Sequence, residues 1–161
     1  MIREARPDDW AEIWQVFDAI VQDGETYAYP TDLTSEQAQR LWFEQPPART
    51  VVLEEHGSIL GTAKMGPNKP SYGAHIGTAS FMVSDAARGQ GVGRQLGEHV
   101  ITWHREQGFR GIQFNAVVES NTAAVNLWSD LGFEIIGTVP GAFRSRRHGY
   151  VGLHVMFLDL T

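Results

Sequence analysis

Cysteine is absent from this chain of 161 residues. Its absence excludes disulfide bonds, thiolate metal sites and a cysteine nucleophile, and it fits a cytoplasmic location, which we expect for the protein. The sequence also lacks a signal peptide and an apolar run long enough to cross a membrane, so we expect no membrane partner. Lysine is scarce as well: eleven of the 13 basic residues are arginine, whose forked donors suit paired contacts with anions.

The net charge of −6 argues against nucleic acid as a main partner. The charge is uneven along the chain. Residues 1–85 carry 13 acidic and 6 basic side chains, a balance of −7, whereas residues 86–161 carry 6 and 7, a balance of +1. The second half is therefore the more favourable one for an anion. The length, with 42% hydrophobic and 20% charged residues, predicts one globular domain over residues 1–161.

Hydrophobic periodicity and turn residues predict a mixed α/β protein. We expect helices over 7–23, 34–43, 92–107 and 121–131. We expect strands over 2–5, 51–53, 59–65, 74–83, 112–118, 133–139 and 150–158. An aromatic loop over 25–30 and a basic loop over 141–149 complete the pattern.

The stretch over residues 88–94, RGQGVGR, follows a β-rich run and opens an amphipathic helix. Its alternating glycines lack Cβ atoms, so backbone N–H groups can approach an anion closely, and the first helical turn adds unpaired donors. A Walker A loop would continue Gly-Lys-Ser/Thr, and a dinucleotide fingerprint would read GxGxxG after the first strand. Neither pattern matches. The stretch predicts a pyrophosphate cradle.

A second motif, NxxAxxLWxxLGF over residues 121–133, follows the glycine loop at a helix start. Together, the two motifs closely resemble the GNAT superfamily of acetyl-CoA-dependent N-acetyltransferases, over residues 1–158. The resemblance implies an α/β fold with a mixed central sheet of about seven strands, splayed in the middle, and four helices on its two faces. It also implies acetyl-CoA as the acyl donor, with no metal.

The same resemblance implies which residues hold the donor. The pyrophosphate would lie on Arg88, Gly89, Gln90, Gly91, Val92, Gly93 and Arg94. The pantetheine arm would lie between the strands at 74–83 and 111–118, in contact with Phe81, Met82, Val83, Asn121, Ala124 and Trp128. Asn121 is also suited to capping the helix that it precedes, and the two roles are compatible.

Acyl transfer needs a neutral amine, donors for the oxyanion and a thiolate that can leave. Backbone N–H groups near Met82 and Val83 are candidates for the oxyanion donors. Many family members have a tyrosine where Trp128 stands, and an indole N–H is not a practical acid, so we interpret Trp128 as a packing or CoA contact. The thiolate can leave unassisted, because a thiol has a pKa of about 8.5.

Asn115 and His75 are the candidate catalytic residues. Alternation places Phe114 and Ala116 on one face of their strand and Asn115 on the other, beside the expected splay. Asn115 is either a substrate or water ligand or a hydrogen-bonded core amide. His75 precedes the bulge expected on the central strand, and it is either a proton relay or a packed histidine. The segment 114–118 resembles the azetidine-2-carboxylate and proline-analogue acetyltransferases, in which an asparagine here is functional.

The aromatic and basic loops resemble those of the phosphinothricin and methionine sulfoximine acetyltransferases. Thr26 and Tyr27 are candidates for lining the acceptor pocket, or they anchor the loop. Arg144 and Arg147 are candidates for binding a substrate carboxylate, as alternatives to a dimer contact or a solvated loop. The expected function is acetyl transfer to a small amino-acid-like amine by direct attack in a ternary complex.

Two other functions remain open at this point: a non-catalytic CoA sensor, and a protein or peptide N-acetyltransferase. The family resemblance and the aromatic content lead us to expect a homodimer.

Overall fold

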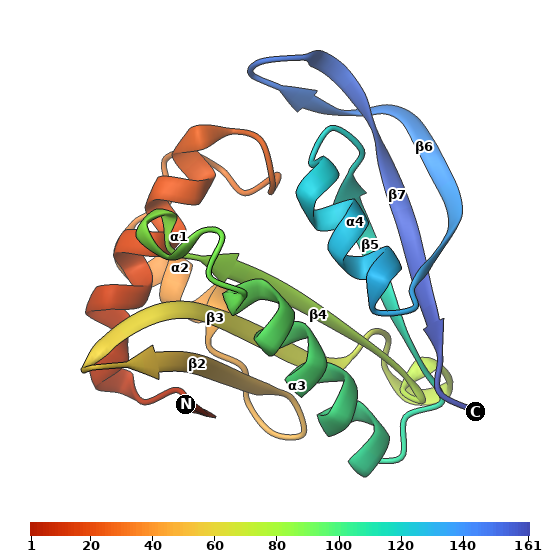
Figure 1. Cartoon of the computed structure of the whole chain (residues 1–161), viewed down its shortest axis with the longest axis horizontal. Coiled ribbons are helices and arrows are strands. Elements are labelled where there is room, and N and C mark those ends of the chain that lie inside the picture. The colour runs from red at the N-terminus through yellow and green to blue at the C-terminus, as the bar shows by residue number, and fades with distance from the viewer.

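The computed structural model describes all 161 residues, and its elements follow the order that the sequence predicts. The four helices are α1 (Trp10–Asp23), α2 (Ser35–Trp42), α3 (Val92–Glu106) and α4 (Thr122–Asp130). The seven strands are β1 (Ile2–Glu4), β2 (Arg49–Glu55), β3 (Ser58–Pro67), β4 (Ile76–Val83), β5 (Gly111–Val118), β6 (Glu134–Ser145) and β7 (Gly149–Asp159). They form one sheet in the order β1-β2-β3-β4-β5-β7-β6, in which only β4 and β5 are parallel (Figure 1).

Local signals in the sequence fix several element ends. Gly24 ends α1 in the left-handed conformation, with a φ of 71°. Thr34 opens α2 in a capping box: its hydroxyl accepts from the Gln37 N–H, and the Gln37 side chain accepts from the Thr34 N–H. The predicted hairpin turn between β2 and β3 is confirmed at His56 and Gly57, both of which have positive φ.

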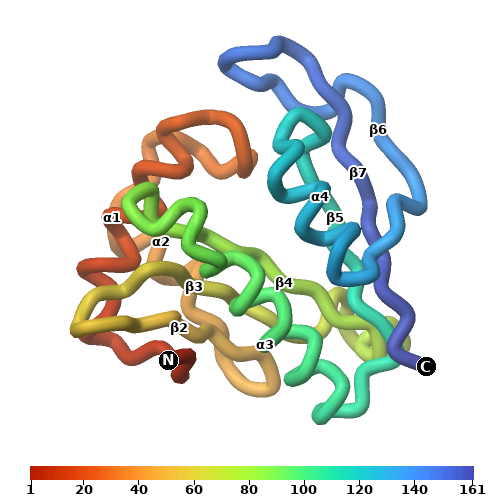
Figure 2. Tube along the Cα trace, viewed as in Figure 1, coloured from red at the N-terminus to blue at the C-terminus, as the bar shows by residue number.

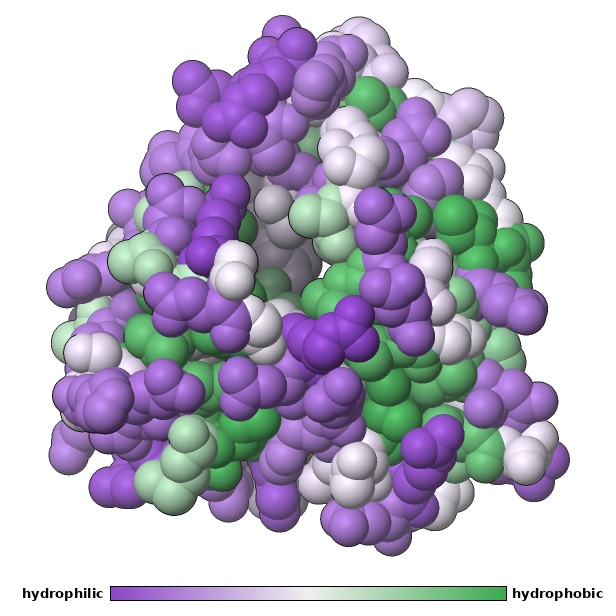
Figure 3. All heavy atoms as spheres, in the orientation of Figure 1, coloured by the Kyte–Doolittle hydropathy of each residue, from purple (hydrophilic) through white to green (hydrophobic).

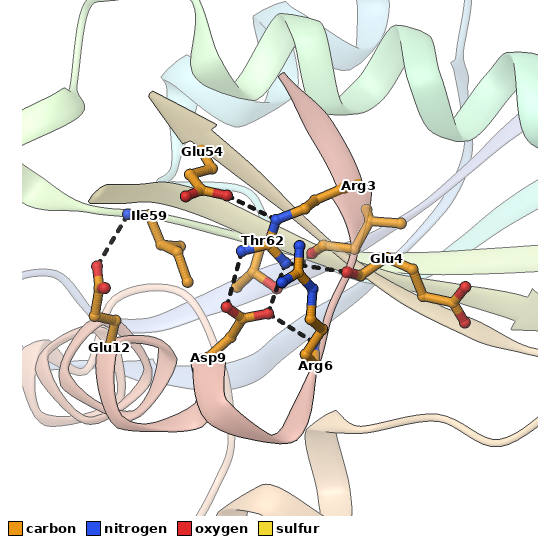
Figure 4. Close-up of polar contacts among 9 residues, drawn as sticks. Arg3, Glu4, Arg6, Asp9, Glu12, Glu54, Ile59 and Thr62 are labelled. Carbon is orange, nitrogen blue, oxygen red and sulfur yellow. Dashed lines mark hydrogen bonds and ion pairs between the residues drawn. The ribbon is translucent and has the colours of Figure 1, made fainter. Parts of the chain in front are cut away.

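Ion pairs hold the first strand to the helix that follows it. The Arg3 guanidinium donates to Glu54 on β2 at 2.7 Å and to both oxygens of Asp9 at 2.8 and 2.9 Å (Figure 4). The hydrogen bonds from Arg3 hold the pKa of the Asp9 carboxyl below its usual range. Glu12, on α1, accepts from the backbone N–H of Ile59 on β3 at 3.0 Å. These contacts fix the start of α1 against the sheet.

Alternation along the strands divides the core between the two faces of the sheet. Val51 and Leu53 on β2 pack with Leu96 of α3, whereas Val52 between them packs with Phe17 and Trp42 of α1 and α2. Figure 2 shows α3 crossing in front of β3 and β4, away from α1 and α2. The helices therefore cover the two faces in pairs, as predicted.

The sheet splays between β4 and β5. The two strands pair only through Ile76 with Gly111 and Gly77 with Ile112, and beyond these residues they separate. Gly77 is required at this point, because a Cβ there would lie 2.2 Å from the ring of His104 on α3. The predicted splay is thus confirmed, and it leaves the later part of β4 with an unpaired edge.

A β-bulge interrupts β5 and corrects one expectation. Phe114 pairs with Met156 and Val117 with His154, so β5 advances by three residues where β7 advances by two. Phe114 and Val117 are both buried, and Asn115–Ala116 are both exposed. The simple alternation that placed Ala116 on the face of Phe114 is therefore wrong, because the extra residue shifts the register.

The range expected for the basic loop, residues 141–149, is also wrong. The strand β6 continues through Arg144 to Ser145, and only Arg146, Arg147 and His148 form the turn to β7. No periodic apolar signal marks the end of β6, because Glu134 to Ala142 are exposed on both faces of this edge strand. Pairing with β7, rather than burial, extends it.

Candidate active site

A cavity of about 740 Å³ occupies the splay between β4 and β5. The glycine loop and the start of α4 form one end of it. The end of α1, the loop that follows it and the β6–β7 turn form the other end, through Asp23, Glu25, Thr26, Tyr27, Arg147 and His148. Figure 3 shows the hollow near the middle of the molecule, with hydrophilic residues above it and hydrophobic ones to its lower right. The cavity gathers most of the predicted site residues from six segments of the chain.

The glycine loop is shaped for close approach by a ligand. Gly89 and Gly91 have φ values of 78° and 75°, and a Cβ at either position would have no atom within 4 Å. Arg88 forms an exposed ion pair with Asp85 at 2.8 Å, and Arg94 pairs with Asp130 of α4 at 3.2 Å. The loop therefore offers backbone donors and two solvent-exposed guanidinium groups around open space, which fits a pyrophosphate.

The predicted loop residues mostly line the cavity. Arg88, Gly89, Gly91, Val92, Gly93 and Arg94 all contribute to its wall, but Gln90 does not. The Gln90 amide donates instead to the backbone oxygen of Ala86 at 3.1 Å. The Asn121 side chain caps α4 by accepting from the Ala124 N–H at 3.3 Å, and both residues line the cavity.

The open edge of β4 presents backbone groups to the cavity. The N–H of Ser84 donates to Leu60 on β3, so the alternating residues Met82 and Ser84 direct their backbone groups to β3. Phe81 and Val83 consequently direct theirs into the gap. This corrects the expectation that the Met82 N–H is an oxyanion donor, because that N–H is directed at β3 and not at the gap.

Aromatic side chains form one wall of the cavity. Trp128 is buried, with its ring centroid 4.5 Å from that of Phe81 and 4.9 Å from that of Phe114. Phe114 stacks in turn on Phe133 at 4.2 Å. Trp128 thus packs between β4 and β5 where they separate, which supports its interpretation as a packing residue with a face toward the cavity.

Asn115 lies on the bulge of β5 and lines the cavity. Its amide nitrogen donates to the Asn68 side-chain oxygen at 2.7 Å, and its oxygen accepts from the Gln113 side chain at 2.9 Å. It is exposed, not buried as the alternative role of a core amide requires. Both ends of the amide are therefore oriented by neighbours while one side of it faces the cavity.

His75 and Arg144 lie outside the cavity. His75 is exposed and comes just before β4, at the end where β4 and β5 are still paired, so the structure does not bring it to the other candidates. Arg144 is exposed on β6 opposite Tyr150 and does not line the cavity. Neither of the two alternatives given for His75 matches this position, because the ring is neither packed nor near the splay.

The sequence analysis missed a group of contacts that closes the far end of the cavity. We call it the clasp: residues 22–25, at the end of α1 and the start of the loop that follows it, bonded to residues 145–147. Glu25 accepts from the Ser145 hydroxyl at 2.6 Å and from the Arg147 N–H at 2.9 Å, and Arg147 pairs with Asp23 at 2.9 Å. The Ser145 bond, with the backbone N–H and the charge of Arg147, holds the pKa of Glu25 below its usual range.

No local pattern signals the clasp, because its partners lie about 120 residues apart in sequence.

Elsewhere, no group of three or more His, Cys, Asp or Glu side chains gathers as a metal site would require. None of the helices combines the length and the apolar character needed to span a bilayer.

Comparison with known proteins gives the family. The family model described as "Acetyltransferase (GNAT) family" matches residues 9–133. The chain belongs to the GNAT acetyltransferase family. Membership makes this GNAT protein an acetyl-CoA-dependent N-acyltransferase, as the two sequence motifs predicted.

Individual relatives cover most of the chain. It is 34% identical over 149 residues to the L-methionine sulfoximine/L-methionine sulfone acetyltransferase of Pseudomonas aeruginosa, covering 86% of this chain and 83% of the relative. A GCN5-related N-acetyltransferase from Kribbella flavida superposes with a TM-score of 0.96 at 55% identity, and the match covers 99% of this chain and 97% of the other. A phosphinothricin acetyltransferase from Sinorhizobium meliloti in complex with AcCoA shares the fold, with a TM-score of 0.87 at 23% identity. The match covers 99% of this chain and 88% of the other.

Proposed function

We propose that this GNAT enzyme transfers an acetyl group from acetyl-CoA to the amine of a small amino-acid-like acceptor. The observation that carries the proposal is the clasp, which closes the acceptor end of the cavity with side chains of both charges. An enclosed end suits a small molecule better than a polypeptide tail. The 34% identity to a methionine sulfoximine acetyltransferase supports the same substrate class.

The donor end supplies the binding groups. The glycine loop and its two arginines hold the pyrophosphate, with Asn121, Ala124 and Trp128 along the arm. The backbone groups of Val83 face the gap and can hydrogen-bond to the arm as a neighbouring strand would, whereas those of Phe81 are bonded to the Tyr27 hydroxyl. Acetyl-CoA supplies the activated thioester when it is bound.

The reaction is direct attack of a neutral amine on the thioester carbonyl, within a ternary complex. The Val83 N–H faces the gap and is the candidate donor to the developing oxyanion. The C–N bond forms, the C–S bond breaks, the amine gives up a proton to solvent, and CoA leaves as the thiolate. No residue of the cavity wall needs to protonate the sulfur, because a thiolate whose thiol has a pKa of about 8.5 is a fair leaving group and takes up a proton from solvent after it leaves.

Asn115 is our proposed acceptor-side residue. The bulge turns it toward the cavity, and its two amide neighbours, Asn68 and Gln113, set its orientation. Asn115→Ala is expected to lower kcat while the affinity for CoA stays unchanged, since the donor contacts are untouched. An equal loss of CoA binding would contradict this role.

Arg147 is our proposed carboxylate ligand, with the Glu25 carboxylate and Thr26 on the same wall for the ammonium side of the acceptor. Arg144 provides a matched control, because it lies on the same hairpin but outside the cavity. Arg147→Ala is expected to raise the KM for the acceptor by about tenfold or more, the effect of one lost charge-assisted hydrogen bond. Arg144→Ala is expected to leave the KM unchanged.

The deciding experiment is a thiol-release assay with acetyl-CoA and a panel of free amino acids, methionine sulfoximine and short peptides. Turnover on free amino acids or their analogues, with none on peptides, is the expected result. CoA binding without turnover on any amine would overturn the proposal and favour a sensor. Faster turnover on peptides than on free amino acids would favour a peptide acetyltransferase.

We also propose a homodimer through β6. This edge strand exposes Ile136 by 59% and Val139 by 55%, and Tyr150 beside it on β7 by 75%. Unpaired apolar edges of this kind associate unless they are covered. Sedimentation at micromolar concentration is expected to give twice 17.9 kDa, and a species of 17.9 kDa alone would refute the dimer.

A further inference from the structure

The Tyr27 hydroxyl occupies the open edge of β4. It donates to the backbone oxygen of Phe81 at 2.6 Å and accepts from the Phe81 N–H at 2.8 Å. These are the two bonds that a neighbouring strand would make, and β5 has already separated from β4 at this level. A side chain from the α1–α2 loop therefore covers the free edge of β4 at Phe81.

The position along β4 decides what meets Tyr27. Residues that direct their backbone groups into the gap alternate along the strand, as Val83, then Phe81, then Ala79. An acyl-CoA arm that starts at the glycine loop, just after β4, passes Val83 first and reaches Phe81 next. Its thioester end therefore arrives where the Tyr27 hydroxyl is bonded, and the acceptor groups of the clasp lie beyond.

Tyr27 is held firmly in this place. Its ring packs against Tyr29 with centroids 5.6 Å apart, and Tyr29 packs against Phe17 of α1 at 5.2 Å. Burial raises the pKa of Tyr27, so the hydroxyl stays protonated and keeps donating to Phe81. Moving the ring would break two hydrogen bonds and disturb an aromatic cluster that reaches the core.

We infer that Tyr27 sets the length of the acyl group that the enzyme accepts, because its fixed ring closes the end of the β4 edge. This inference rests on the proposed acetyl transfer and goes beyond it, by assigning donor specificity to one residue outside both sequence motifs. Acetyl ends before the ring. A propionyl or butyryl chain extends into the space that the ring fills.

The test compares three variants with acetyl-CoA, propionyl-CoA and butyryl-CoA. Tyr27→Ala opens the end of the edge, and Tyr27→Phe keeps the ring without the hydroxyl. Tyr29→Ala is the matched control, because Tyr29 belongs to the same aromatic cluster but does not line the cavity. Tyr27→Leu replaces Tyr27→Ala if the alanine variant does not fold.

Two measurements are made on each variant: the ratio of kcat/KM for butyryl-CoA to that for acetyl-CoA, and the Kd of each acyl-CoA by calorimetry without acceptor. Tyr27→Ala is expected to raise the activity ratio by about tenfold or more, in line with the discrimination that one or two methylenes produce in a pocket. The wild type is expected to bind butyryl-CoA more weakly than acetyl-CoA, and Tyr27→Ala to bind both alike. Tyr27→Phe and Tyr29→Ala are expected to keep the wild-type ratios.

An unchanged ratio in a folded Tyr27→Ala variant would overturn the inference. So would an equal rise in Tyr29→Ala, since the effect would then come from a loosened loop. Loss of turnover with every acyl-CoA in Tyr27→Phe, with binding retained, would also overturn it and make the hydroxyl a catalytic group. A wild type without turnover on any amine would instead refute the proposed function, and the calorimetric comparison would still judge the role of Tyr27.

Discussion

Substituting Gly91 by alanine tests the glycine loop quantitatively. Gly91 has a φ of 75°, and a Cβ built there has no atom within 4 Å, so the change creates strain without a clash. An alanine in the left-handed region costs about 1–2 kcal/mol. For a protein of this size the melting temperature should fall by about 2–8 °C.

The same glycine geometry elsewhere in the chain supplies the control. Gly108, after α3, has a φ of 81° and equally open surroundings, and it lies far from the cavity wall. Gly108→Ala should therefore lose the same stability, whereas only Gly91→Ala places a methyl group where the pyrophosphate approaches the backbone. Losing one charge-assisted contact costs about 1.5 kcal/mol, or about tenfold in Kd.

The assay is CoA binding by calorimetry beside thermal unfolding, for both variants. The expected result is similar destabilisation in the two and a rise of about tenfold or more in the Kd of Gly91→Ala alone. Unchanged CoA affinity in a Gly91→Ala variant that is destabilised like Gly108→Ala would refute the assignment of the loop to the pyrophosphate.

Three further predictions concern the core and strand β5. Thr62 is fully buried, and its hydroxyl accepts from the Trp42 indole at 3.0 Å and donates to the Val51 oxygen at 2.8 Å. In denaturant titrations, Thr62→Val should therefore lower the free energy of unfolding by about 2–4 kcal/mol, and Thr62→Ser should lower it by less. Burial lowers the pKa of His104, so on acidification the unfolded chain takes up a proton near pH 6.5, before the folded protein does. The free energy of unfolding should therefore fall as the pH drops below this value, and it should fall less in His104→Gln. Asn115→Asp should keep CoA affinity while making kcat depend on pH, measured as a rate profile.

Much of the donor site could be predicted because its signals are local. A loop with alternating glycines before a helix, and an asparagine at the next helix start, lie within a few residues of the groups that they position. Gly89, Gly91 and Asn121 accordingly line the cavity as expected. The same holds for the capping box at Thr34 and the turn at Gly57, where the backbone conformation follows from adjacent residues.

The end of the cavity that we propose for the acceptor was harder to predict because its parts are distant in sequence. The Glu25–Ser145 and Tyr27–Phe81 bonds join segments separated by 120 and 54 residues, and no periodicity connects them. The bulge at Asn115 also escapes a period-two pattern, since the pattern assumes one residue on each strand at every step. His75 illustrates the converse: a residue of a suitable type lies next to the right strand but just before its first residue, at the end where β4 and β5 are still paired.

The sequence by itself determined the elements, the glycine loop and the family, because local conformational preference and motif spacing specify these without reference to distant residues. Only the tertiary structure decided where β4 and β5 separate, which edge groups of β4 face the gap, and which loops close it. Those features depend on strand register and on side chains brought together by folding. The family's acyl donor is therefore indicated by motifs in the sequence, whereas the limits that we propose for the acyl group and the acceptor depend on Tyr27, Glu25 and Arg147, which folding brings to the cavity.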